Sequence, residues 1–193
     1  KKNKKNSSKL KYFYLDIRNF KSLKKKLRNN FNFDYVVNLG GYINHSKTNG
    51  DKIFSEHVIC LVNLFKLLSK KRLKNFIQIG SSAEYGMSNN TSETTRENPL
   101  TFYSAGKVAA TLISQMLFFN EKIPITVLRF FQVYGPGQKD DRLIPYVIKS
   151  CLKNKKFKLT KCEQVRDFCY VEDIVNAIIL CLKGKNVAGN VYN

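Results

Sequence analysis

The sequence predicts an α/β fold in which short apolar strands alternate with amphipathic helices along the chain. Three short runs rich in apolar residues, at 34–39, 75–79 and 125–131, have the length and composition of buried strands. Stretches with helical periodicity separate these runs, and the connections are short. This alternation is typical of βαβ units, so we expect a parallel sheet. Ligands of such sheets bind at the carboxyl ends of the strands.

The first elements are expected in the basic N-terminal part of the chain. Residues 10–15 are expected to form a strand that ends at the Asp-Ile pair 16–17. A helix is expected over 19–28, where apolar residues recur at helical spacing. The run at 34–39 ends at a glycine pair and has the form of a parallel strand buried on both faces.

The elements that follow continue the same alternation. We expect helices at 53–70 and 102–121, strands at 75–79 and 125–131, and a last helix that ends near residue 183. The carboxyl ends of the strands then carry Asp16, the pair Gly40-Gly41, Ser81 and the segment after Phe131. Because these ends meet at one edge of a parallel sheet, the periodicity alone predicts a ligand site there.

The charge of the chain is strongly positive, with a formal net value of +20. A charge of this size suits a nucleic-acid-binding protein. However, twelve Lys and Arg residues fall within 1–30 against a single acidic residue, and the rest are spread over the expected helices. No known nucleic-acid-binding motif is present. A basic cleft suits an anionic small-molecule substrate equally well, so we expect no nucleic-acid partner.

The cysteine and histidine content favours a chain without disulfides or metal. The five cysteines are odd in number and lack Cys-x-x-Cys pairing, which favours reduced thiols. The two histidines have no partners at the spacing of zinc ligands. Neither a signal peptide nor a membrane-length apolar run occurs, so we expect a cytoplasmic protein without a membrane partner. Because the chain begins at Lys1 and ends inside an expected strand at Val191–Asn193, we expect a fragment.

The most informative stretch is Pro99–Lys107, where Tyr103 and Lys107 stand four residues apart on an expected helix. At about 3.6 residues per turn both side chains lie on one face, so the ammonium can approach the phenol. A neighbouring cation favours the phenolate, and we expect it to lower the pKa of Tyr103 from about 10 toward neutrality. Such a phenol can exchange a proton with a sugar hydroxyl or a carbonyl. Alone, the pair is a weak signal, because a solvated lysine beside a half-buried tyrosine gives the same pattern.

Further motifs surround this pair in a fixed order. Upstream lies Ile79–Gly86 (Ile-Gly-Ser-Ser-Ala-Glu-Tyr-Gly), and downstream lies Leu128–Gln138, which contains Gln-Val-Tyr-Gly-Pro-Gly-Gln. Together the motifs resemble the extended short-chain dehydrogenase/reductase family over nearly the whole chain, in particular its nucleotide-sugar epimerases, dehydratases and reductases. The resemblance implies a Rossmann-like doubly wound sheet, here lacking its first βαβ region and the glycine-rich phosphate loop. It also implies a dinucleotide-binding domain over 1–137 and part of a substrate-binding region over 138–193, with 166–183 packing back on the first domain.

The resemblance implies a catalytic set of Ser81, Tyr103 and Lys107. Ser81 stands four residues before Tyr85, where the family carries its catalytic Ser or Thr, and its hydroxyl would bond the reacting oxygen of the substrate. Tyr103 would be the general acid/base, and Lys107 would lower its pKa and hold the nicotinamide ribose. As an alternative, Ser81 or its neighbour Ser82 could simply cap the loop.

The resemblance also implies NAD or NADP as the cofactor. The cofactor-binding positions would be Asp16, Ile17, Leu39, Gly40, Gly41, Tyr103 and Lys107. Asp16 and Ile17 match the family's Asp-hydrophobic pair near the adenine, although Asp16 could equally cap the following helix. The glycine pair would let the backbone approach the dinucleotide, although a plain strand-to-loop turn would also use glycine.

The substrate-binding positions implied by the resemblance are Ser81, Ser82, Gln132, Arg142 and Arg166. Gln132 stands where the family carries an Asn that contacts the phosphates of the substrate. Arg166 would pair with the diphosphate of a nucleotide sugar through charge-assisted hydrogen bonds. A surface salt bridge from Arg166 to Asp167 or Glu163 is the alternative.

The departures from the family pattern bear on the reaction. In the 4,6-dehydratase branch an Asp-Glu pair or an equivalent Glu directly follows the Ser or Thr, whereas here Ser82 and Ala83 follow. Glu56 and His57 stand opposite the family's usual Asn, without an assigned role. We therefore expect an NAD(P)-dependent nucleotide-sugar epimerase or 4-keto reductase, with hydride transfer at a hexose carbon, working as a homodimer. A 4,6-dehydratase and a non-catalytic NAD(P)- or nucleotide-sugar-binding protein are the alternatives.

Overall fold

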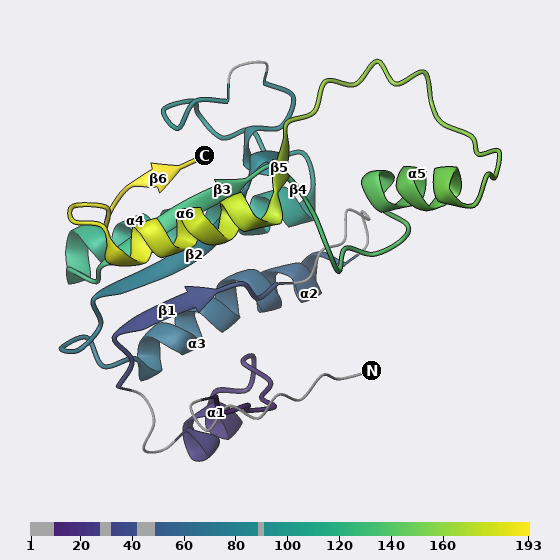
Figure 1. Ribbon diagram of the computed structural model, residues 1–193. Coiled ribbons are helices and arrows are strands. Elements are labelled where there is room, and N and C mark those ends of the chain that lie inside the picture. Colours follow the sequence, from purple (N-terminus) through teal and green to yellow (C-terminus); the bar gives the residue numbers. More distant parts are fainter. Residues whose placement is uncertain (1–9, 28–31, 42–48, 89–90) are drawn as a thin grey trace.

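A computed structural model describes residues 10–27, 32–41, 49–88 and 91–193, and it contains the expected parallel sheet (Figure 1). Its strands lie in the order β1 (Tyr35–Asn38), β2 (Asn75–Ser81), β3 (Ile125–Phe130) and β6 (Val191–Tyr192). Each strand is parallel to its neighbours. The carboxyl ends of β1, β2 and β3 therefore lie at the same edge of the sheet, where the periodicity predicts a ligand site.

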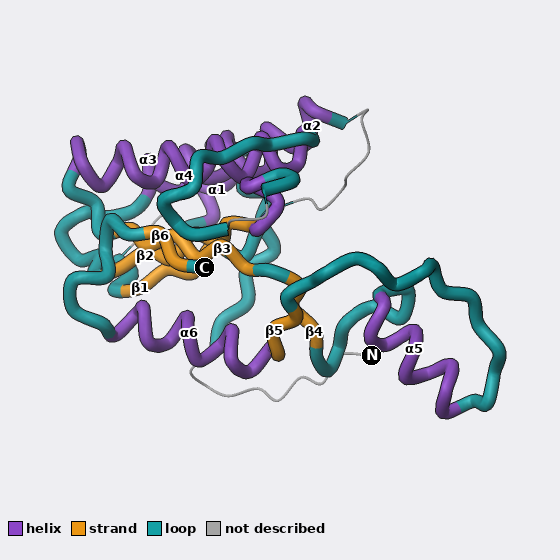
Figure 2. The backbone as a smooth tube through the Cα atoms, turned by 90° about the horizontal axis from the view of Figure 1, so that it is seen from above, coloured by secondary structure: helices purple, strands orange, loops and turns teal. Residues whose placement is uncertain are grey.

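Helices cover both faces of the sheet, which confirms the doubly wound α/β fold (Figure 2). α3 (Cys60–Leu67) and α4 (Phe102–Glu121) lie on one face, and α6 (Val171–Lys183) lies on the other. α2 (Gly50–Phe54) and a π-helical turn, η1 (Ser55–Ile59), lead directly into α3.

The core lies between β2 and β3 on one side and α3 and α4 on the other. Its centre is a cluster of buried apolar side chains: Leu61, Phe65, Leu73, Phe76, Ala110, Ile123 and Ile125. The rings of Phe65 on α3 and Phe76 on β2 lie 4.6 Å apart between centroids. Burying an apolar side chain of this size contributes about 1.5–3 kcal/mol. This cluster therefore holds the two helices against the strands whose ends form the site.

The chain after β3 leaves the main sheet and forms a smaller unit. β4 (Gln132–Tyr134) pairs in parallel with β5 (Phe168–Tyr170), and α5 (Leu143–Leu152) has no buried residue. None of these three elements is expected from the sequence. Figure 1 shows α5 held away from the main sheet by the loops on either side, while α6 returns to pack against β2 and β3. The division into domains at 137/138 stays a prediction.

Two expectations about strands are wrong. Residues 10–15 form no strand; this segment lies against α1 (Phe20–Lys26), where the Lys26 ammonium donates to the Tyr14 carbonyl oxygen at 3.1 Å. A strand needs backbone hydrogen bonds to a neighbour, and no ladder joins this segment to the described strands. β1 is half-buried rather than buried on both faces, because it is an edge strand of the described sheet.

The remaining elements are close to their expected bounds. The helix expected at 53–70 is a continuous helical stretch over 50–67, with the π-helical turn in its middle. α1 is shorter than the expected 19–28, and Arg28 lies outside the described residues. The helix expected at 102–121 is confirmed. None of the helices in the described part of the chain combines the length and apolar composition needed to cross a membrane.

Candidate active site

Ser81 ends β2 and begins the short helical turn η2 (Ser82–Tyr85) at the carboxyl edge of the sheet. Its hydroxyl oxygen accepts a hydrogen bond from the Ala83 amide at 3.2 Å, so Ser81 caps this turn, as the alternative interpretation predicts. Ser82 is half-buried in the same turn. The turn ends at Gly86, whose φ is 65° and where a Cβ atom would lie 2.1 Å from the Asn98 carbonyl oxygen. Only glycine can take this position without strain, which explains the Tyr-Gly pair.

Tyr103 and Lys107 lie in the first turns of α4 and face the end of β2. A capping box fixes the start of the helix. Tyr103 is only 8% exposed and Lys107 only 5%, so the interpretation as a solvated lysine beside a half-buried tyrosine is wrong. The Lys107 ammonium donates to the Ile79 carbonyl oxygen at 2.8 Å and lies 5.9 Å from the centroid of the Tyr103 ring. Tyr103 also shares a hydrogen bond with the Ser81 side chain, so the structure brings the three residues together.

The expected effect of Lys107 on the acidity of Tyr103 is wrong for this structure. Burial raises the pKa of Tyr103 above its ordinary value, while the hydrogen bond to Ser81 acts in the opposite direction. The Glu84 carboxylate raises this pKa further, and the Arg142 charge lowers it. The Lys107 ammonium donates its hydrogen bond to the Ile79 carbonyl oxygen instead of to the phenol. Burial lowers the pKa of Lys107 itself to about 8, against the opposing effect of Glu84.

His57 packs directly behind Tyr103. It lies on the π-helical turn, is buried, and its imidazole meets the Tyr103 ring edge-on with the centroids 5.6 Å apart. A Cβ atom on Gly41 would lie 2.2 Å from the imidazole, and Gly41 has a φ of +139°. His57 therefore links the loop after β1 to the helix that carries Tyr103. The sequence signal for this residue is its place opposite the family's Asn, which by itself indicates no packing partner.

A cavity of about 380 Å³ brings the two predicted cofactor segments together. Its walls include Asp16 and Ile17 from the first segment and Gly40 and Gly41 from the second. Leu39 is 70% exposed and does not line this cavity. The first segment is tied to α3 by Asn63, whose side-chain amide donates to the carbonyl oxygens of residues 17 and 18, both at 3.0 Å. Asn63 is a buried anchor that the sequence analysis missed, because its partners lie more than forty residues away.

Asp16 projects its carboxylate at the edge of this cavity. Its two oxygens accept hydrogen bonds from the Arg18 guanidinium at 2.9 and 2.8 Å, and Arg18 also lies 3.7 Å from Glu56. The hydrogen bond from Arg18 lowers the pKa of Asp16. Asn19, not Asp16, caps α1, since its side chain accepts from the Ser22 amide at 3.0 Å. The interpretation of Asp16 as the helix cap is therefore wrong.

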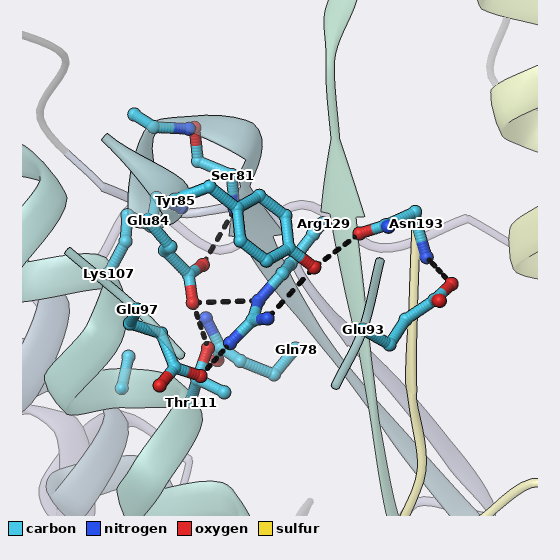
Figure 3. Close-up of polar contacts among 12 residues, drawn as sticks. Gln78, Ser81, Glu84, Tyr85, Glu93, Glu97, Lys107, Thr111, Arg129 and Asn193 are labelled. Carbon is cyan, nitrogen blue, oxygen red and sulfur yellow. Dashed lines mark hydrogen bonds and ion pairs between the residues drawn. The ribbon is translucent and has the colours of Figure 1, made fainter. Parts of the chain in front are cut away.

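A buried ion pair lies beneath Ser81 and beside α4 (Figure 3). The Arg129 guanidinium on β3 donates to Glu84 at 2.9 Å, to the Tyr85 hydroxyl at 3.0 Å and to Glu97. Arg129 and Glu84 are both almost fully buried. Burial alone would lower the pKa of Arg129, but the Glu84 and Glu97 carboxylates raise it overall. The guanidinium therefore stays charged and fixes the turn after β2 to β3.

The predicted substrate residues lie on more exposed segments. Gln132 is exposed on β4, and its backbone amide donates to the Asp167 carbonyl oxygen at 3.0 Å. Arg142 is exposed at the start of α5, yet near enough for its charge to act on Tyr103. Arg166 is exposed and donates to the Val165 carbonyl oxygen at 3.2 Å. The alternative interpretation, a surface salt bridge from Arg166 to Asp167 or Glu163, is wrong, because no such ion pair forms among these described residues.

The described residues contain no group of three or more His, Cys, Asp or Glu side chains that could hold a metal ion. All five cysteines are free thiols. Cys60 lines the cavity beside Glu56, and burial raises its pKa to about 11. Its thiol therefore stays protonated near neutral pH and is a poor nucleophile.

Comparison with known proteins identifies relatives over most of the chain. The model of the NAD dependent epimerase/dehydratase family matches residues 1–193, which confirms the resemblance carried by the motifs. The chain is 29% identical to UDP-glucuronate 4-epimerase of Thermodesulfobacterium geofontis, over 93% of the chain and 57% of that protein. It is 28% identical to dTDP-D-glucose 4,6-dehydratase of Dictyostelium discoideum, over 83% of the chain and 40% of that protein. The chain thus spans about half the length of the curated relatives it matches.

A solved structure extends this similarity to the fold. UDP-glucuronic acid 4-epimerase from Bacillus cereus, in complex with UDP-glucuronic acid and NAD, superposes with a TM-score of 0.78 at 28% identity. The match covers 92% of this chain and 57% of that chain.

Proposed function

Because this chain belongs to the NAD dependent epimerase/dehydratase family, we propose that it carries the catalytic groups of an NAD(P)-dependent nucleotide-sugar epimerase or 4-keto reductase. The observation that carries the proposal is the convergence of Ser81, Tyr103 and Lys107 at the carboxyl end of β2. The cavity lined by Asp16 and Gly41 lies at the end of the neighbouring strand β1. A hydroxyl, a phenol and an ammonium at one point can bind and protonate or deprotonate a single oxygen.

The cavity between the first segment and the glycine pair suits a dinucleotide. Asp16 offers a carboxylate to ribose hydroxyls, and Gly40 and Gly41 line the same cavity. Ile17 would face the adenine, and Leu39 would reach the cofactor from the exposed rim. When bound, NAD or NADP would accept a hydride from a sugar carbon and return it.

The protein groups then have separate tasks. Ser81 would hold the oxygen on the reacting hexose carbon, and Tyr103 would take the proton from that oxygen or return it. Lys107 would hold the nicotinamide ribose and supply a positive charge close to the phenol. In the structure Tyr103 already meets the Ser81 side chain, which supports a shared oxygen as their target.

The position of Glu84 favours an epimerase or a reductase over a dehydratase. Elimination of water needs an acidic side chain that can reach the substrate, and Ser82 and Ala83 follow Ser81 in this chain. Glu84 is the next acidic residue, but it is fully buried and bonded to Arg129 and Thr111. Its carboxylate is therefore directed into the core and away from a substrate.

A nucleotide-activated hexose is the substrate that the basic segments suit. Ser82 and Gln132 would contact the sugar and the phosphates, while Arg142 and Arg166 would pair with the diphosphate. The α4 surface supports a homodimer, since Leu112, Met116 and Phe119 form an exposed apolar stripe on that helix.

The test uses the complete protein with NAD or NADP and a panel of nucleotide sugars and their 4-keto derivatives. Nicotinamide absorbance and the sugar products are followed, and at least one substrate should be converted. Tyr103→Phe should lower turnover by about 100-fold or more, whereas Tyr12→Phe, at an exposed position, should not. Bound cofactor without conversion of any substrate would indicate a binding protein and overturn the enzyme proposal. Full turnover by Tyr103→Phe would remove the role given to the phenol.

A further inference from the structure

The Glu84 carboxylate lies at the base of the candidate active site, although the proposed chemistry does not use it. Glu84 is fully buried in the turn η2, three residues after Ser81. Figure 3 shows its carboxylate directed at Arg129 and Thr111, with Lys107 close by. Gly80 leaves the space for it, because a Cβ atom there would lie 2.7 Å from a Glu84 oxygen. The backbone before Ser81 is thus shaped around this carboxylate.

Both oxygens of Glu84 accept hydrogen bonds from donors on three different elements. One oxygen accepts from the Ser81 amide at the end of β2 at 2.8 Å. The other accepts from the Thr111 hydroxyl on α4 and from the Arg129 guanidinium on β3, each at 2.9 Å. Burial raises the pKa of Glu84, whereas the contacts with Arg129, Ser81 and Thr111 act in the opposite direction and favour the ionised carboxylate. Glu84 therefore fixes the position of Ser81 relative to the helix that carries Tyr103 and Lys107.

Stability alone gives no strong reason to bury this ion pair. Removing two charges from water costs several kcal/mol per ion, and apolar residues of similar volume are often as stable or more so. The nearby charges give a different reason. Glu84 faces Arg129 on β3. On α4 its charge acts on Lys107 and Tyr103. Tyr85 follows it in the same turn. Glu97 also meets Arg129, and Arg142 acts on Tyr103 from the far side.

The carboxylate has a definite electrostatic effect on the two titrating groups of the site. Burial lowers the pKa of Lys107, and the Glu84 charge opposes this by raising it. Burial raises the pKa of Tyr103, and the Glu84 charge adds to that effect. With Glu84 ionised, both the lysine and the tyrosine therefore hold their protons to higher pH.

We propose that Glu84 is a positioning residue, whose buried carboxylate fixes the Ser81 backbone and supplies the negative charge that keeps Lys107 and Tyr103 protonated between turnovers. This inference rests on the proposed function of these residues as the catalytic set. Glu84 itself touches neither substrate nor cofactor in this scheme. It acts through its hydrogen bond with the Ser81 amide and through its charge, which acts on Lys107 and Tyr103.

The test measures the protonation of Tyr103 and Lys107 directly, in the complete protein and without substrate. Carbon-13 labels in the tyrosine rings and lysine side chains are titrated by NMR, and Tyr103→Phe and Lys107→Arg identify the two signals. In Glu84→Gln, which keeps the shape but removes the charge, both groups should titrate at lower pH than in the unsubstituted protein. Thr111→Val is the matched control, because it removes a donor to the same carboxylate and leaves its charge in place. Its titrations should coincide with those of the unsubstituted protein.

Turnover gives a second readout. The pH profile of kcat should shift to lower pH in Glu84→Gln, with turnover at neutral pH reduced by about 10-fold, and Glu84→Asp should restore part of it. If Glu84→Gln does not fold, the double variant Glu84→Gln/Arg129→Met removes both buried charges together. Both titrations should then shift in the same direction by a smaller amount, because loss of the Arg129 charge acts in the opposite direction. Coincident titrations in Glu84→Gln, or in the double variant, would overturn the inference. Shifted titrations in a protein that converts no nucleotide sugar would instead contradict the proposed function and leave the electrostatic role intact.

Discussion

The two sides of the candidate site are built in different ways. On the β2–α4 side, Tyr103, Lys107 and Glu84 are buried, and hydrogen bonds fix them to the strands. On the β4–β5 side, Gln132 and Arg166 are exposed, and α5 has no buried residue. One side belongs to the core of the protein, whereas the other stands outside it (Figure 1).

This difference matches what the proposed function requires of each side. A group that exchanges a proton must lie within hydrogen-bond reach of the reacting oxygen, so it needs a position fixed by packing. A charge that attracts a diphosphate acts over a longer range and can work from an exposed segment. We therefore expect substitutions on the first side to change stability and chemistry together, and substitutions on the second to change substrate binding alone.

The largest expected effect comes from breaking the buried ion pair. Arg129→Ala leaves Glu84 as a buried charge without its main partner, which should lower the free energy of unfolding by about 3–5 kcal/mol. Urea denaturation of the complete protein measures this. Arg166→Ala, on the exposed side, should change the unfolding free energy by less than about 0.5 kcal/mol. Equal losses in the two variants would remove the distinction between the two sides.

The next effect is a dependence of stability on pH that comes from Lys107. Its pKa is about 8 in the folded protein against an ordinary value of 10.5. Between these values the unfolded chain keeps a proton that the folded chain has lost, so stability should rise with pH by up to about 3 kcal/mol. Lys107→Met should remove this rise. The measurement is the free energy of unfolding at pH 7 and at pH 10, from denaturation of each variant. Lys153→Met, at an exposed lysine, should keep it, and a rise that survives in Lys107→Met would contradict the assignment.

The smallest effect is expected on the exposed side. Arg166→Ala should raise KM for the nucleotide sugar by about 10-fold, because one charge-assisted contact to the diphosphate is lost, and should leave kcat nearly unchanged. Initial rates over a range of substrate concentrations separate the two constants. Arg72→Ala, at the opposite end of β2 and paired with Asp34, serves as the control. A fall in kcat with constant KM would place Arg166 with the catalytic groups instead.

Local sequence patterns predict the parts of this site that depend on local structure. The helical spacing of Tyr103 and Lys107 and the position of Ser81 after an apolar run both follow from periodicity, and the structure brings these residues together. The rule that parallel strands end at one edge places the glycine pair, which follows β1, at this edge. Asp16 reaches the same cavity although the strand expected before it does not form.

The residues that hold the site could not be predicted in the same way. Arg129 meets Glu84 across 45 positions of sequence, and Asn63 meets the Asp16 segment across a similar distance. Such pairs depend on tertiary packing, which periodicity does not describe. The prediction of a lowered pKa for Tyr103 is wrong for a related reason. The spacing shows that Lys107 is close to Tyr103, but it does not show that the Lys107 ammonium bonds to the Ile79 carbonyl oxygen. Residues 10–15 have the composition of a strand without the neighbour that a strand needs.

The contact between Gly41 and His57 also limits how this sequence can vary. The glycine has room for a hydrogen atom alone, since a methyl group at that position would overlap the imidazole. Any variant with a larger residue at 41 must therefore carry a smaller one at 57, and the ring of Tyr103 would then lose the surface that supports it. The two positions are interdependent, and library designs that randomise one while fixing the other should return glycine at 41 whenever histidine is retained at 57.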